Sequence, residues 1–289
     1  MRRGPNELRL LRIDIVARRL PAYAEWGFVV PDLNWNKTTW GSTYAWHDSG
    51  EEWSTAWGGS EAQWFGAIFP RLHRFLPARR ILEIAPGFGR WTKYLIPACD
   101  EFVGIDLSTK CVDACRDRFA SAKHAQFFAN DGHSLAAAKN ESFDLIFSFD
   151  SLVHAEVDVL TSYIPQVLRK LALGGVAFLH HSNLLAYGNK IGMQHGRAQT
   201  VSGDTVAELI KRGDGTILIQ EVVNWGGEHL IDCFSLFARR DSYPAAKAVR
   251  LQNPVFMGEA TIIQHFQSPY SALSRADYAP VTAALTGTG

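Results

Sequence analysis

The sequence predicts an α/β fold in which a doubly wound, mostly parallel sheet carries helices on both faces. Three observations favour this fold class. Apolar runs that suit buried strands alternate with helix-compatible segments between about residues 78 and 215. The first of these strands runs into a glycine-rich turn. Near the end, 216–223 and 230–237 are two strand-like runs joined by a short turn, which predicts a seven-stranded sheet with an antiparallel last strand.

Each element has a recognisable pattern. Parallel strands are expected at 80–85, 101–106, 125–129, 143–149 and 175–182, and helices at 90–98, 109–120, 157–171 and 202–212. A further helix is expected over 60–76, with Ser60 as its N-cap. The tail from about 240 has little periodicity, and its end is expected to be frayed. This reading divides the chain into an N-terminal cap (1–77), a sheet domain (78–240) and a C-terminal extension (241–289).

Composition narrows the class of protein. The chain has 289 residues, 47% of them hydrophobic, and a formal net charge of +0, so it lacks the basic excess typical of nucleic-acid enzymes. The sequence contains no run of about 18 apolar residues, which predicts no membrane span. Its first 19 residues lack the continuous apolar core of a signal peptide. We therefore expect a cytoplasmic protein that binds neither nucleic acid nor membrane, and leave a homodimer open.

The turn after the first strand predicts a nucleotide ligand. Gly87 and Gly89 precede a helix-compatible stretch, and glycines let backbone amides approach a ligand closely. The dinucleotide pattern requires a third glycine, but Thr92 stands there, which disfavours NAD. A P-loop is excluded because no Gly-Lys-Ser/Thr follows. Asp106 ends the second strand, at about the interval expected for a ribose-binding carboxylate.

These motifs resemble the class I S-adenosylmethionine-dependent methyltransferases. Their first motif, E/D-x-G-x-G-x-G, reads here Glu83-x-Ala85-x-Gly87-x-Gly89. Ala85 departs from the pattern, and alanine is expected to permit close approach only at negative φ. The resemblance covers about residues 78–238 and implies a Rossmann-like fold, with S-adenosylmethionine as cofactor and S-adenosylhomocysteine as product. Its cofactor-binding candidates are Glu83, Ala85, Gly87, Gly89, Arg90, Asp106, Leu107, Asp131, Gly132 and Phe149.

A narrower resemblance concerns the acceptor. The segment 52–64, the motif that begins at Leu82, the segment Phe149–His154 and the segment His180–Asn183 resemble methyltransferases of bacterial surface-polysaccharide and deoxysugar biosynthesis. This resemblance implies a sugar or glycan hydroxyl as the acceptor. The same residues also fit a small-molecule N-, C- or O-methyltransferase of secondary metabolism. A third alternative is a non-catalytic protein that binds S-adenosylmethionine, which acidic and basic residues near the methyl group disfavour.

Seven of the nine tryptophans lie before residue 78. One interpretation is that their rings form the core of a cap over the sheet's carboxyl edge. The other is that some of them stack on a substrate, since aromatic faces suit sugars and cations. The second interpretation gives the substrate-binding candidates Trp57, Ser60, Trp64 and Trp91.

Transfer to a hydroxyl calls for a general base, and histidine suits that role near neutral pH. The first candidate is His154, which follows Asp150 by four residues, so that the carboxylate could orient the imidazole. His181 at the end of the next strand is the second candidate. No metal is expected, because the His-His-Ser-Asn sequence is a poor ligand set for a hard cation.

Overall fold

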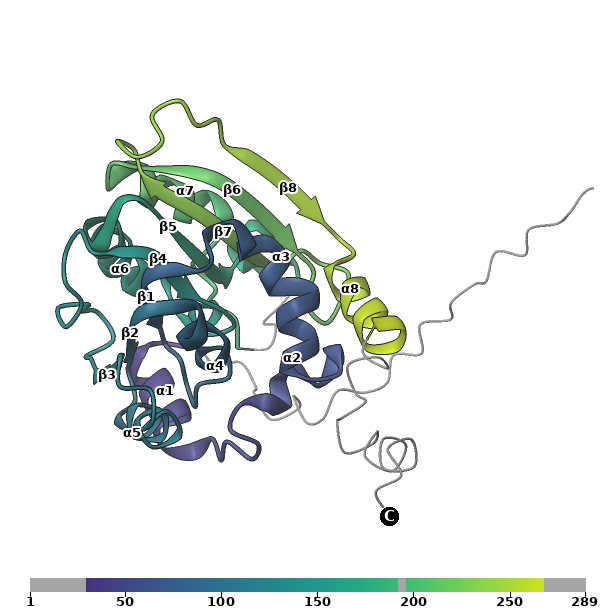
Figure 1. Ribbon diagram of the computed structural model, residues 1–289. Helices are drawn as coiled ribbons and strands as arrows, with labels where there is room; N and C mark the ends of the chain where they lie inside the picture. Colours follow the sequence, from purple (N-terminus) through teal and green to yellow (C-terminus); the bar gives the residue numbers. More distant parts are fainter. Residues whose placement is uncertain (1–29, 192–195, 268–289) are drawn as a thin grey trace, which may run out of the picture.

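The computed structural model describes residues 30–191 and 196–267, which form one mixed sheet with helices on both faces (Figure 1). The predictions for the first 19 residues, Trp26 and the last four residues lie outside this part of the chain. The sheet has eight strands in the order β3-β2-β1-β4-β5-β7-β6-β8. In chain order they are β1 (Ala78–Ile84), β2 (Cys99–Asp106), β3 (Ala125–Ala129), β4 (Phe143–Ser148), β5 (Leu171–Ser182), β6 (Gly215–Val223), β7 (Asp232–Arg239) and β8 (Val249–Asn253).

Strand pairing follows the predicted topology with one addition. Strands β1 to β5 pair in parallel, and β7 inserts antiparallel between β5 and β6. The eighth strand pairs in parallel with β6 at the edge of the sheet. The predicted count of seven strands is therefore wrong, and the added strand lies in the tail that has little sequence periodicity. Strand β8 escaped prediction because four of its five residues are exposed, so no alternation of buried positions marks it.

The helices divide between the two faces (Figure 1). Helices α6 and α7 cover one face, while the helical segment 60–75 and α8 lie on the other. The main helices are α1 (Leu33–Thr38), α2 (Ser60–Gln63), α3 (Phe69–Leu72), α4 (Thr92–Leu95), α5 (Thr109–Arg118), α6 (Val157–Lys170), α7 (Gly203–Arg212) and α8 (Phe256–Ile262). Short 3₁₀ and π-helical segments extend or join them: η1 (Thr39–Thr43), η2 (Glu51–Trp57), η3 (Trp64–Ile68), η4 (His73–Phe75), η5 (Ile96–Ala98), η6 (Leu152–His154), η7 (Leu184–Lys190) and η8 (Ile263–Gln267).

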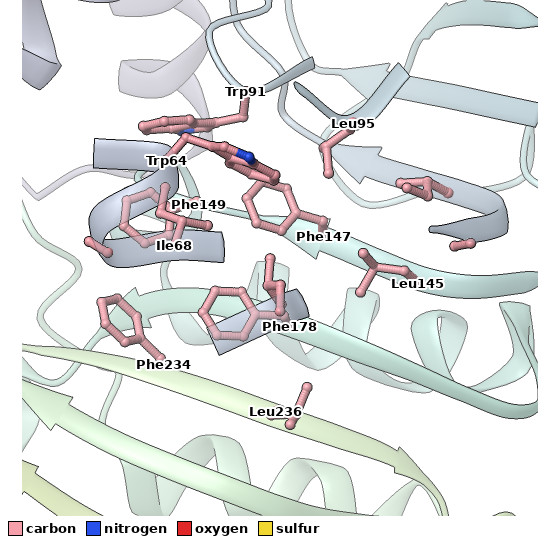
Figure 2. Close-up of a cluster of buried hydrophobic side chains, with 14 of the residues drawn as sticks. Trp64, Ile68, Trp91, Leu95, Leu145, Phe147, Phe149, Phe178, Phe234 and Leu236 are labelled. Atoms are coloured by element: carbon pink, nitrogen blue, oxygen red, sulfur yellow. The ribbon is translucent and has the colours of Figure 1, made fainter. Parts of the chain in front are cut away.

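Alternate residues of the central strands supply two separate cores, as expected for a sheet covered on both faces. Ile146 of β4 packs toward α6, whereas its neighbour Phe147 packs toward the segment 60–75. Figure 2 shows this second core, in which Trp64 lies beside Phe147 and Trp91 lies against Trp64. This core packs the end of the N-terminal segment, which we define as residues 30–77, against the sheet.

The helix expected over 60–76 is present as consecutive helical turns over 60–75, but its start differs from the prediction. Gly59 is the N-cap, with φ 117° and ψ 167°. Such a conformation favours glycine, so the backbone sets the helix start. Ser60 is the first helical residue, and its hydroxyl lies 3.0 Å from that of Tyr94.

Candidate active site

A pocket lies at the carboxyl ends of β1, β2 and β4, where open α/β sheets bind their ligands. The N-terminal segment contributes one wall: Leu33, Asn36, Trp40, Trp46, Gly50 and Trp53. The strands' ends and the segments that follow them contribute the rest: Ala85, Pro86, Gly87, Phe88, Arg90, Trp91, Ile105, Asp106, Leu107, Cys111, Gly132, Phe149, Asp150, Ser151, Leu152, His154, Ala155, Val159, Tyr163, Arg197 and Trp225.

The turn after β1 runs through left-handed conformations at Ala85 (φ 58°), Gly87 (59°) and Gly89 (85°). A Cβ atom on Gly89 would lie 2.4 Å from the ring of Phe119, so this position requires glycine. The expectation of negative φ at Ala85 is wrong. Its amide donates to the Ile105 carbonyl at 2.7 Å, and its carbonyl accepts the Ser151 hydroxyl at 2.9 Å. These two hydrogen bonds hold the residue in a conformation that costs free energy.

Asp106 ties the second strand to the glycine turn. One carboxylate oxygen accepts the amide of Gly87 at 3.0 Å, and the other accepts the amide of Ser108 at 2.8 Å. Burial raises the pKa of Asp106 to about 6, against the opposing effect of these hydrogen bonds. Each carboxylate oxygen has a second lone pair. The two backbone contacts are therefore compatible with hydrogen bonds from ribose hydroxyls.

Three of the cofactor-binding candidates are absent from the described pocket lining: Glu83, Gly89 and Asp131. Glu83 lies buried under the turn and accepts the hydroxyl of Thr92 at 2.6 Å. Burial raises the pKa of Glu83 to about 8. Its hydrogen bond with Thr92 ties the end of β1 to the start of α4, so this carboxyl supports the turn between them. Asp131 is exposed and accepts the amides of residues 133 and 134 at 2.8 and 2.7 Å, as a local turn cap does.

Of the three tryptophans predicted to bind substrate, one belongs to the aromatic wall of the pocket. Trp57 and Trp64 are core residues with 1% and 3% exposure, and neither they nor Ser60 line the pocket. Trp91 does line it, together with tryptophans 40, 46, 53 and 225. Trp46 stacks on Phe88 with ring centroids 4.6 Å apart. The rings before β1 thus divide between the core and the pocket, and stacking of the pocket rings on a substrate stays a prediction.

Charged side chains gather in the part of the pocket that follows β4. Arg90 donates to the carboxylate of Asp150 at 2.8 Å, and both side chains are less than 10% exposed. Arg197 lies 3.8 Å from the same carboxylate and donates twice to Asp232, at 3.0 and 2.9 Å. His180 completes this charged cluster, with Nε2 3.0 Å from Asp232. Positive and negative charges therefore alternate through a largely buried site.

His154 lines the pocket, but Asp150 does not orient it as predicted. Its Nδ1 atom lies 2.8 Å from the carbonyl oxygen of Gly196, and its ring packs against Trp35 and Trp40 with centroids 6.1 and 5.2 Å away. Because a carbonyl only accepts, Nδ1 carries the proton and the basic lone pair is on Nε2. Burial, followed by the charge of Arg197, lowers the pKa of His154 to about 4.

His181 is buried on the face of β5 opposite to that of His180. Its ring nitrogens lie 2.8 Å from the Ser182 carbonyl and 2.8 Å from the Ser235 hydroxyl, and the residue does not line the pocket. Its partners are those of a structural histidine. The neighbouring His180 belongs to the charged cluster instead.

Sequence reasoning missed His180, Arg197 and Asp232. Strand alternation places His180 on the same face as Phe178, which separates it from His181, but no local pattern says which face meets the pocket. Arg197 follows the segment 192–195 and carries no motif. Asp232 begins a strand 52 residues after His180, and only the antiparallel pairing of β5 and β7 brings them together.

Within 30–191 and 196–267, no group of three or more His, Cys, Asp or Glu side chains could hold a metal ion. Over the same ranges, no helix has both the length and the hydropathy needed to cross a membrane.

Comparisons with known proteins agree with this geometry. Residues 81–175 match the family model of a methyltransferase domain. No curated protein sequence matches the chain. Among solved structures, an S-adenosylmethionine-dependent methyltransferase from Clostridium acetobutylicum is 17% identical, with TM-score 0.50 over 64% of this chain and 92% of that one. The N-methyltransferase NodS from Bradyrhizobium japonicum, in complex with S-adenosylhomocysteine, is 18% identical, with TM-score 0.51 over 71% and 96%.

At these identities the solved structures establish the fold, and the family match establishes the type of domain. The match runs from β1 through the glycine turn and the loops that line the pocket to the first part of β5. Residues 81–175 therefore match a methyltransferase domain, and the fold is that of S-adenosylmethionine-dependent methyltransferases of known structure.

Proposed function

We propose that this enzyme transfers the methyl group to a hydroxyl of a sugar or glycan. The observation that carries the proposal is the pairing of an aromatic wall with a charged cluster in one pocket. Trp40, Trp46 and Trp53 offer apolar ring faces, and Arg90 and Asp150 offer hydrogen-bonding groups beside them. Aromatic faces suit the C–H surfaces of sugars, while a carboxylate and a guanidinium suit hydroxyl groups.

The cofactor would occupy the end of the pocket formed by the glycine turn. Asp106 would accept the ribose hydroxyls there, beside the glycine turn that lines this end of the pocket. Gly132 and Leu107 line the same end, and Leu33 lies against Gly132. The bound cofactor supplies an electrophilic methyl group on a sulfonium. The protein then contributes alignment of the acceptor and removal of its proton.

His154 would be the general base. Its lowered pKa keeps the ring neutral at pH 7, and Gly196 fixes the tautomer with the lone pair on Nε2. A hydroxyl becomes strongly acidic only as the new O–C bond forms, so a weak neutral base can accept the proton late in the reaction. Asp150 would bind the acceptor hydroxyl beside Arg90.

Substitution of the histidine tests this role. His154→Ala should lower turnover by about 10²–10⁴, the range for loss of acid–base catalysis, while S-adenosylhomocysteine affinity stays within a few-fold. His181→Ala is the matched control, since that ring lies outside the pocket lining. Turnover would be followed by mass spectrometry of the methylated product over a panel of saccharides. A His154→Ala enzyme as active as the parent would remove the base from the proposal.

A second candidate is N-methylation of an amine. A neutral amine brings its own lone pair and needs a weaker base than a hydroxyl does, which fits the low pKa of His154. The structurally similar NodS is an N-methyltransferase. A panel of primary and secondary amines, run beside the saccharides, distinguishes the two. Activity on amines alone would overturn the sugar proposal and leave the site assignments in place.

We also propose that the reaction needs no metal. The candidate base and the charged cluster supply the proton acceptor and the charges that a cation would otherwise provide. Treatment with a chelator should leave turnover unchanged. Loss of activity that magnesium restores would contradict this part of the proposal.

A further inference from the structure

The charged cluster is organised around Asp232, a carboxylate that does not itself line the pocket. Asp232 begins β7 and is 0% exposed. It accepts hydrogen bonds from Nε and Nη2 of Arg197 at 3.0 and 2.9 Å, and its other close contact is Nε2 of His180 at 3.0 Å. One buried carboxylate thus fixes Arg197, which lines the pocket, and His180, which does not.

His180 carries this contact on to Asp150. The backbone amide of Asp150 lies 3.0 Å from Nδ1 of the ring. Because an amide can only donate, Nδ1 accepts, and the ring proton is on Nε2, where it points to Asp232. Asp150 has φ 60°, a left-handed conformation that non-glycine residues rarely adopt. Its amide hydrogen bond therefore holds the residue in a conformation that it would otherwise leave.

Asp232 also positions the side chain of Asp150, through Arg197. Its carboxylate lies between Arg90, at 2.8 Å, and Arg197, at 3.8 Å. Asp232 fixes the guanidinium of Arg197 through two parallel hydrogen bonds, a geometry that sets its plane as well as its distance. Asp232 consequently acts on Asp150 twice, on its backbone through His180 and on its carboxylate through Arg197.

We propose that Asp232 is a positioning residue of the acceptor site, and that His180 and Arg197 transmit its position to Asp150. The inference rests on the proposed function in one respect, since it takes Asp150 to contact the acceptor. It adds His180 of β5 and Asp232 of β7, neither of which lines the pocket, to the acceptor site, and it gives Arg197 of the pocket lining a positioning role. No substrate atom needs to touch Asp232 or His180 for them to control turnover.

Two histidine variants separate the contacts. In His180→Asn the shorter amide can replace Nδ1 as the acceptor for the Asp150 amide, whereas in His180→Gln the longer amide can replace Nε2 toward Asp232. We expect the Asp150 amide to exchange with deuterium at least tenfold faster in His180→Gln than in His180→Asn. NMR of the full chain in complex with S-adenosylhomocysteine measures this and needs no acceptor. Equal exchange in the two variants would overturn the role of His180.

Kinetics test the role of Asp232. Asp232→Asn should lower kcat/KM for the acceptor at least tenfold, while the Kd for S-adenosylhomocysteine stays within about threefold. Glu221→Gln is the control, because it removes one charge of a partly buried ion pair that lies outside the pocket lining. If both variants lose kcat/KM equally, the effect is one of general stability and the proposal is wrong. The two histidine variants, assayed in the same way, keep the test decisive if Asp232→Asn does not fold.

The proposed function and this inference fail differently. If amines are methylated and saccharides are not, the sugar proposal fails, yet the variants still report on positioning. If the panel yields no methylated product, the proposed acceptors are wrong and amide exchange alone decides the inference. If a saccharide is methylated but Asp150 exchange does not distinguish the variants, only the inference fails.

Discussion

Ala85 occupies a left-handed conformation at a turn position where the family motif has glycine. For an L-residue this conformation costs about 1–2 kcal/mol, partly offset by the extra chain entropy that glycine brings to the unfolded state, about 0.5–1 kcal/mol. We therefore expect Ala85→Gly to raise the melting temperature by roughly 1–3 °C, measured by calorimetry without ligand. Ala129→Gly, in the exposed part of β3, is the control and should lower it. A fall at both positions would show that Ala85 is not strained.

The carboxyl of Asp106 accepts a hydrogen bond from the glycine turn and is also the proposed acceptor for the ribose hydroxyls. Asp106→Ala should weaken S-adenosylhomocysteine binding by about 2–4 kcal/mol, because hydroxyl donors lose an ionised partner. The pKa of about 6 adds a pH dependence: the carboxylate gains its proton as the pH falls through 6, so wild-type affinity should fall below that pH. Calorimetric titration of Asp106→Asn should show weaker binding without this step. Asp131→Ala, which changes an exposed turn cap, should have a much smaller effect.

The residues of the site differ in how far sequence could predict them. Asp106 and Gly87 belong to a local strand–turn pattern whose geometry follows from a few neighbouring residues. Asp232 does not, because its partners come from β5 and from the segment after residue 195, and only the completed sheet brings them together. The two histidines of β5 show what sequence cannot predict. Strand alternation places them on opposite faces of the sheet, but only tertiary packing decides that His180 contacts Asp232.

At the scale of elements, an ion-pair network links α3 to the last part of the chain. Arg71 of α3 donates two hydrogen bonds to Glu221 of β6, at 2.8 and 2.7 Å, and two to Glu259 of α8, at 3.1 and 2.9 Å. Asn253 of β8 donates to both carboxylates. The network therefore joins the N-terminal segment to the strand and helix that sequence periodicity missed.

This network predicts a loss of stability in acid. Burial acts to raise the pKa of Glu221, but hydrogen bonds and the charge of Arg71 outweigh it and lower the pKa. The folded protein then binds that proton less tightly than the unfolded chain, so the stabilisation is present above the ordinary glutamate pKa of about 4.3 and is lost as the pH falls below it. Glu221→Gln should cost about 1–3 kcal/mol at pH 7, with a smaller difference in acid.

Denaturant unfolding at pH 7 and pH 3.5 measures both quantities. Asp204→Asn serves as the comparison, because its ion pair with Arg250 is exposed and should contribute less than about 1 kcal/mol. A Glu221→Gln penalty that does not shrink in acid would assign the effect to packing rather than to charge. The helices and strands also differ in how far sequence could predict them. Buried helices and strands carry a periodic pattern of apolar residues, whereas the position of β8 depends on its pairing with β6 and on this ion-pair network.

At the scale of the whole molecule, the N-terminal segment forms one wall of the pocket and contacts the loops after β1 and β4. Asn36 donates to the carbonyl of His154 at 2.8 Å, and Trp46 lies against the glycine turn, where a Cβ atom on Gly87 would be 2.8 Å from its ring. The tryptophan-rich composition indicated a cap over this edge of the sheet. It could not indicate which rings face the pocket, because the spacing of the tryptophans follows no single helix.

The division of the rings between core and pocket predicts a specific optical signal. Trp46 is the indole nearest the glycine turn among those that line the pocket before β1, so a ligand that binds at the turn should change its surroundings and its fluorescence. S-adenosylhomocysteine should therefore alter the emission of the wild-type protein, and Trp46→Phe should lose most of that change. Trp57→Phe is the control, since Trp57 is 1% exposed in the core and its replacement should leave the response intact. If Trp46→Phe keeps the full response while Trp57→Phe loses it, ligand binding instead repacks the core between the N-terminal segment and the sheet.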